Sequence, residues 1–203
     1  MRAKSELRDK DEKIEREVGR FLDGTFYKEE TSDFTRHWDK GLQVLGVDTE
    51  FTLDGKRYMC DEKSTAQYRD IQTFTLELSF IDRNNDRKIG WLLDDGNINN
   101  SYLFAWLDTD KVEIALVEKK TLMEHLESIG WTKERLYRKQ EKARDAFENG
   151  WYERLGNLDR DGIRFIYSKH LVEEPINAML ARDTYRQLSV FNKCYPTKQF
   201  AKK

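Results

Sequence analysis

Cysteine and proline are scarce in this chain, with two of each among 203 residues. Cys60 and Cys194 lie far apart, and neither belongs to a CxxC or CxxH pair. That spacing argues against a zinc site and against a disulfide framework. So few cysteines are typical of a reducing compartment, and we expect a cytoplasmic protein.

Long apolar runs are also missing. No stretch approaches the ~20 apolar residues of a membrane-spanning helix, and the N-terminal MRAKSELRDKDEK has no apolar signal core. The sequence therefore predicts neither a membrane partner nor secretion. An excess of positive charge is absent too, because the net charge is −2. Contact with nucleic acid must then depend on local basic patches.

What the chain does have is charge and aromatic side chains, at 36% and 12% of its residues. This composition and length favour one folded domain over residues 1–203. Alternating and helical patterns predict an α/β or α+β fold, with a mixed central sheet flanked by helices. Residues 28–41 are expected to be irregular, with Trp38 as an anchor. The other expected elements are helices at 5–23 (ended by Gly24), 122–129, 133–150 and 182–189; strands at 73–80, 89–93, 102–107, 112–117 and 163–167; and either type at 176–180.

The most informative stretch is residues 45–63, LGVDTEFTLDGKRYMCDEK, which predicts a β-hairpin. Asp54-Gly55 suits a two-residue turn, because both positions tolerate positive φ. That turn sets a register in which Asp48 faces Asp61 and Gly46 faces Lys63 on one side of the ladder. Two carboxylates are then expected to lie directly opposite each other.

Facing carboxylates need a compensating charge. At about 5 Å and an effective dielectric constant of about 20, their repulsion is roughly 3 kcal/mol, and like charges in this position destabilise a sheet. A divalent cation would remove the repulsion, since Mg²⁺ binds one or two carboxylates together with water and phosphate. Lys63 points to the same side as Asp61, and Gly46 would leave room for its stem.

This arrangement resembles the PD-(D/E)XK nuclease superfamily, in which an acidic residue on one strand is followed by D/E-x-K on the next. Asp48 matches the first acid and Asp61-Glu62-Lys63 the second element, although Val47 stands where the proline of the motif belongs. The resemblance implies a restriction-endonuclease-like core, here with extra strands. It also implies Mg²⁺- or Mn²⁺-dependent hydrolysis of nucleic acid, with DNA favoured over RNA.

The resemblance further implies roles for individual residues. Asp48 and Asp61 would bind the metal, with the backbone carbonyl of Glu62 as a further ligand, and Lys63 would orient or deprotonate the attacking water. The first core helix of the family often offers a glutamate, which here is Glu17. The alternative for Glu17 is a solvated position on the flank of the helix.

Several other residues have two interpretations each. Glu50 either ligates a second ion or forms a salt bridge to Arg57. Basic residues on the 133–144 helix either contact phosphates or form an ordinary solvated face. Gln67 and Tyr68 either contact substrate or belong to a polar loop, and residues 82–86 resemble part of an EF-hand loop but suit a polar hairpin loop better. The basic candidates are Arg135, Arg138, Lys139 and Lys142, with Lys193, Lys198, Lys202 and Lys203 in the tail.

Three functions remain open from the sequence. The preferred one is a metal-dependent nuclease. The second is a nucleic-acid- or protein-binding module on the same fold, with a residual acidic site. The third is a purely structural hairpin in which Asp48 and Asp61 are solvated and paired with Lys63 and Arg57. Nothing in the sequence indicates an oligomeric state.

Overall fold

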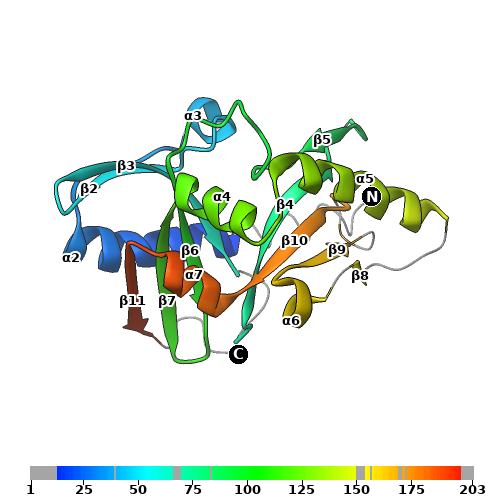
Figure 1. Ribbon diagram of the computed structural model, residues 1–203. Helices are drawn as coiled ribbons and strands as arrows, with labels where there is room; N and C mark the ends of the chain where they lie inside the picture. Colours follow the sequence, from blue (N-terminus) through cyan, green and yellow to red (C-terminus); the bar gives the residue numbers. More distant parts are fainter. Residues whose placement is uncertain are drawn as a thin grey trace. The chain divides into compact units, whose positions relative to one another are not determined.

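The computed structural model describes residues 13–38, 40–65, 70–82, 84–149, 154–155, 157–168, 171 and 173–197. The chain forms two compact units (Figure 1). Unit 1 comprises residues 1–71, 97–120 and 188–203, and unit 2 comprises residues 72–96 and 121–187. The sequence predicts that residues 1–203 form a single domain, and this stays a prediction.

Unit 1 contains a six-stranded mixed sheet in the order β1-β2-β3-β6-β7-β11. β3 and β6 are parallel, and the other neighbours are antiparallel. This confirms the predicted α+β class with a mixed sheet. The strands are β1 (Ser32–Arg36), β2 (Thr49–Leu53), β3 (Lys56–Ser64), β6 (Ser101–Leu107), β7 (Lys111–Glu118) and β11 (Phe191–Pro196), and the short helix α3 is Lys40–Val44.

One helical stretch precedes this sheet in unit 1. Residues 13–22 are α-helical, and the helix continues through a π-helical segment η1 (Asp23–Tyr27) into α2 (Lys28–Glu30). The expected stop at Gly24 is therefore wrong, and the expected start before residue 13 lies outside the described residues. Gly costs a helix only about 1 kcal/mol relative to Ala. Burial of Phe26 and Tyr27 outweighs that cost, because each aromatic side chain contributes more than this when buried.

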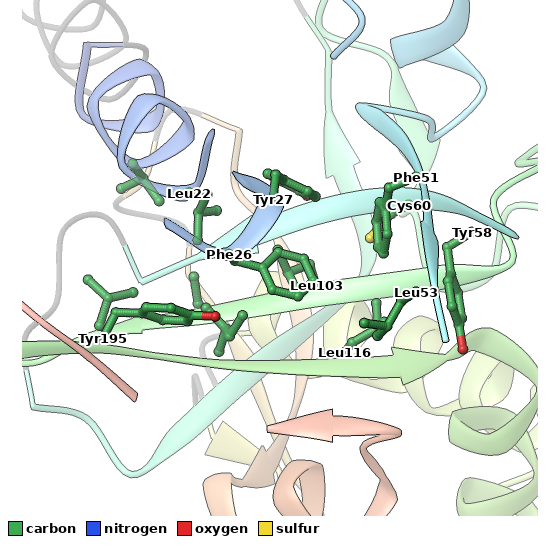
Figure 2. Packing of buried hydrophobic residues seen from close by; sticks show 14 of the residues in the cluster. Leu22, Phe26, Tyr27, Phe51, Leu53, Tyr58, Cys60, Leu103, Leu116 and Tyr195 are labelled. Atoms are coloured by element: carbon green, nitrogen blue, oxygen red, sulfur yellow. The ribbon is translucent and has the colours of Figure 1, made fainter. Parts of the chain in front are cut away.

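The apolar face of this helix packs on one face of the unit 1 sheet. Figure 2 shows Leu22, Phe26 and Tyr27 pointing toward the strands that carry Phe51 and Leu103. The Phe26 ring meets the Phe51 ring edge to face, with centroids 5.6 Å apart. The same core includes Leu53, Tyr58, Cys60, Ile114, Leu116 and Tyr195.

Unit 2 contains an antiparallel five-stranded sheet in the order β5-β4-β10-β9-β8. Its strands are β4 (Thr73–Ile81), β5 (Arg87–Ile89), β8 (Arg154–Leu155), β9 (Arg164–Tyr167) and β10 (Ile176–Ala181). Its helices are α5 (Lys133–Glu148) and α6 (Leu158–Asp161), while α4 (Lys119–Ser128) and α7 (Arg182–Leu188) begin or end at the unit boundary. None of the described helices has the length and apolar character needed to cross a membrane.

Most of the strongly patterned elements match their predictions. Phe74, Leu76 and Leu78 are buried along β4 as the alternation predicts, whereas Phe80, expected on the same face, is half-buried. The strand expected at 89–93 is wrong, because β5 ends at Ile89 and residues 91–93 form a turn. Thr132 caps α5 by accepting a hydrogen bond from the Arg135 N–H at 3.3 Å. The irregular segment predicted at 28–41 is wrong, because it contains β1 and the start of α3. The expected anchor Trp38 is 62% exposed.

Candidate metal and phosphate site

The β2–β3 hairpin has the predicted register. Thr49 pairs with Cys60, Glu50 with Met59 and Leu53 with Lys56, and the ladder ends there, one residue before the predicted Asp48–Asp61 pair. Asp54 and Gly55 have φ angles of 50° and 77°, as a tight two-residue turn requires. The turn chemistry of two residues therefore sets which side chains meet about six positions away along each strand.

Asp48 lies just before β2, where regular strand pairing ends. Its backbone N–H donates to the Cys60 carbonyl at 2.9 Å, and its Oδ2 accepts a hydrogen bond from the Glu62 backbone N–H at 2.9 Å. The carboxylate of Asp48 thus replaces a strand carbonyl as the partner of β3. This bond holds the Asp48 side chain beside residues 61–63.

Asp61 is the buried carboxylate of the site, with 3% of its surface exposed. Its Oδ1 lies 2.7 Å from Lys63 Nζ, and the Asp48 carboxylate lies close enough for its charge to act on Asp61. Burial raises the pKa of Asp61 to about 7; Lys63 opposes this rise, and the charge of Asp48 adds to it. One lysine therefore does not fully compensate the two carboxylates.

The donor set of this pair fits a hard divalent cation. Carboxylate oxygens are the ligands that Mg²⁺ prefers, and one or two of them suffice when water and phosphate complete the shell. Among the residues that the structure describes, no group of three or more His, Cys, Asp and Glu side chains is arranged to hold a metal ion. Asp48 and Asp61 would supply two carboxylate ligands, with water or substrate completing the shell.

Two further predicted ligands occupy other positions. Glu50 accepts a hydrogen bond from His37 Nε2 at 3.0 Å and forms an ion pair with Arg57, so the salt-bridge alternative is the one the structure contains. These partners, Arg57 first, lower the pKa of Glu50. Glu17 is half-buried on the 13–22 helix, and within the described residues no hydrogen bond or ion pair joins it to Asp48 or Asp61.

The side chain of Glu62 lies on the opposite face of β3 from Asp61 and Lys63, because strand side chains alternate. Its Oε2 accepts a hydrogen bond from Arg36 Nη1 at 2.6 Å, and its Oε1 accepts one from the Tyr27 hydroxyl at 2.5 Å. Arg36 also forms an ion pair with Asp23 at 2.6 Å. The resemblance implies only a backbone role for Glu62, and this buried network was not predicted from the sequence.

The sequence indicates only part of this network. Ser32–Arg36 carries an alternating pattern in which Phe34 and Arg36 share one face, but its polar composition hides the strand. The pairing of Arg36 with residue 62 joins positions 26 apart. No local pattern specifies such a partner.

The predicted basic residues lie on α5, in unit 2, whereas the carboxylate pair lies in unit 1. Arg135 stacks on Trp131, with 4.0 Å between Cζ and the ring centroid, and Arg138 pairs with Glu134. Lys139 lies 5.3 Å from the Phe165 ring centroid, and burial lowers its pKa. Lys142 is exposed. Nucleic-acid contact by these residues stays a prediction.

Only some of the remaining candidate residues lie in the part of the chain that the structure describes. Asp82 Oδ1 accepts hydrogen bonds from the N–H groups of Asn84 and Asp86 at 2.8 and 2.9 Å, and Lys88 lies 3.6 Å from Asp82. This is the polar hairpin loop expected there. Lys193 pairs with Glu30. Gln67, Tyr68, Lys198, Lys202 and Lys203 lie outside the described residues.

Gly46 has a different neighbour from the one expected. It has a φ of +74°, and a Cβ there would lie 3.1 Å from the Asn97 side chain, so its lack of a side chain makes room for Asn97 rather than for Lys63. We expect Gly46→Ala to destabilise the protein by about 2 kcal/mol, part from backbone strain and part from this contact.

Gly55→Ala is the matched control for that change. Gly55 has a φ of +77°, but nothing lies within 4 Å of the added Cβ, so only the strain of about 1 kcal/mol applies. Urea unfolding of both variants measures the difference. Equal losses would contradict the packing of Asn97 against Gly46.

Comparison with known proteins gives no family assignment. No protein-family model, no curated protein and no solved structure matches the chain.

Proposed function

We propose that the protein is a metal-dependent phosphodiesterase that cleaves nucleic acid, with DNA as the preferred substrate. The observation that carries this proposal is geometric: the Glu62 N–H holds the Asp48 carboxylate beside the Asp61–Lys63 ion pair, in which Lys63 Nζ lies 2.7 Å from Asp61 Oδ1. Two adjacent carboxylates with a lysine beside them supply both the ion-binding group and the cation needed for phosphate chemistry. The resemblance of residues 48 and 61–63 to the PD-(D/E)XK motif points the same way.

Asp48, Asp61 and Lys63 would each have a separate role in the reaction. Asp48 and Asp61 would hold Mg²⁺ or Mn²⁺ and so place a phosphate next to β3. The bound ion supplies charge stabilisation at the phosphate and a more acidic water. Lys63, released from Asp61 by the ion, would orient the attacking water or stabilise charge on the phosphate oxygens. Burial of Asp61 excludes water from one side of the pair.

The test is a cleavage assay with defined substrates. Supercoiled plasmid, single-stranded DNA and a structured RNA are each incubated with the full chain in Mg²⁺, Mn²⁺ or EDTA. We expect cleavage that needs the metal and that falls at least about 100-fold in Asp61→Ala and Lys63→Ala. Equal cleavage by wild type and both variants would contradict the assignment.

A second candidate function rests on the Lys63–Asp61 ion pair, which already supplies part of the compensating charge. In that case the protein is a nucleic-acid- or protein-binding module with a residual acidic site. Binding of the same substrates without cleavage in any metal would favour this second candidate over the first.

A further inference from the structure

Glu62 connects the two faces of β3. Its backbone N–H donates to Asp48 Oδ2 at 2.9 Å, and its neighbours in sequence are Asp61 and Lys63. Its side chain, on the other face, accepts hydrogen bonds from Arg36 and Tyr27. The orientation of this one residue is therefore linked to the three groups of the candidate site.

Arg36 holds the Glu62 side chain in a fixed direction. Its side chain is only 9% exposed, and its guanidinium binds two carboxylates: Glu62 through Nη1 and Nη2 (2.6 and 3.0 Å) and Asp23 through Nε and Nη2 (2.9 and 2.6 Å). Such two-pronged pairing fixes direction as well as distance. Gly19 gives the guanidinium room, since a Cβ there would lie 3.4 Å from Arg36 Cζ.

Tyr27 adds a second donor to Glu62 Oε1, the carboxylate oxygen that Arg36 Nη2 also contacts. Its hydroxyl lies 2.5 Å from Glu62 Oε1 and 3.0 Å from Thr49 Oγ1, and its ring stacks on Phe34 with centroids 4.2 Å apart. The π-helical segment η1 places Tyr27 on the sheet. The Glu62 side chain is thus held from the helix by Tyr27 and from β1 by Arg36.

We propose that Glu62 is a positioning residue of the carboxylate site: Arg36 and Tyr27 hold its side chain, so that its backbone N–H stays aimed at Asp48 and keeps the Asp48 and Asp61 carboxylates together. This inference rests on the proposed function, because the site it organises is the proposed ion site. Groups that orient metal ligands without touching the metal typically change metal affinity 10- to 100-fold when mutated.

The test measures Mn²⁺ affinity of the full chain by electron paramagnetic resonance titration, without substrate. We expect Glu62→Gln, which keeps the shape but loses the charge, to weaken Mn²⁺ binding at least about tenfold. Arg36→Lys should weaken it similarly, because lysine keeps the charge but cannot bridge two carboxylates in this way. Ile114→Val, a core change on β7, is the control for lost stability and should bind Mn²⁺ like wild type.

Amide hydrogen exchange at Glu62 supplies a second readout that needs no metal. The Glu62 N–H should exchange at least about tenfold faster in Glu62→Gln than in Ile114→Val. Wild-type Mn²⁺ affinity in both Glu62→Gln and Arg36→Lys would overturn the inference.

Different results would contradict the proposed function and the proposed positioning role of Glu62. If the wild-type chain binds no Mn²⁺, the proposed function fails, and the amide result decides whether Glu62 holds Asp48. Unchanged exchange at residue 62 in Glu62→Gln would then overturn the inference as well.

Discussion

Asp61→Asn is expected to raise the melting temperature in EDTA at pH 8 by several degrees. In the folded protein, burial raises the pKa of Asp61 to about 7, against about 3.9 for an unfolded Asp. A raised folded-state pKa means that the stability contributed by this group is present below pH 4 and is lost as the pH rises through 7. The loss is of the order of 4 kcal/mol, and a neutral amide avoids it.

The pH dependence of the melting temperature tests whether ionisation of Asp61 causes the difference. At pH 4 the wild-type carboxyl is protonated in the folded state, so Asp61→Asn and wild type should melt within about 2 °C of each other. The difference should appear between pH 4 and pH 7. Asp54→Asn, at the exposed turn of the same hairpin, serves as control and should change stability by less than about 0.5 kcal/mol at either pH. Destabilisation by Asp61→Asn at pH 8 would contradict the opposed-carboxylate geometry.

Lys63→Met is expected to separate metal binding from cleavage. Lys63 Nζ lies 2.7 Å from Asp61 Oδ1, so a metal ion must compete with it for that oxygen. Methionine keeps much of the apolar stem and removes the competing charge. We expect Mn²⁺ affinity to rise about tenfold, which is 1.4 kcal/mol, while cleavage falls by a factor of about 10² to 10⁴ because the group that assists the water is gone.

Lys56→Met is the matched control for this variant. Lys56 lies at the turn end of β3 and pairs with Glu118 at 2.6 Å, away from the carboxylate pair. The same substitution there should leave both Mn²⁺ affinity and cleavage within about twofold of wild type. Weaker Mn²⁺ binding by Lys63→Met would show that Lys63 supports the ion rather than competing with it.

The parts of the site that could be predicted depend on short-range chemistry. Asp54-Gly55 dictates a two-residue turn, and the turn sets the register up to Thr49–Cys60, which leaves Asp48 and Asp61 next to the end of the ladder. The contact of Lys63 with Asp61 follows from their spacing of two along one strand. Local turn chemistry and alternation were therefore enough to find three of the groups at this site.

The rest depends on partners that are distant in the sequence. Arg36 on β1 reaches Glu62 on β3 across the one strand between them, β2, and β11 pairs with β7 about 80 residues away. The second sheet joins β4 to β10 across about 100 residues, which local periodicity does not encode. The helix that passes Gly24 shows the same limit, because tertiary burial of Phe26 and Tyr27 outweighs a local propensity.

A crystal of the full chain soaked in Mn²⁺ tests the central claim most directly, because the anomalous signal of manganese locates the ion without reference to activity. The account predicts one peak within about 2.2 Å of a carboxylate oxygen from both Asp48 and Asp61, with the Lys63 ammonium moved off Asp61. A fully soaked crystal with no peak there, and with Lys63 still paired to Asp61, would contradict it.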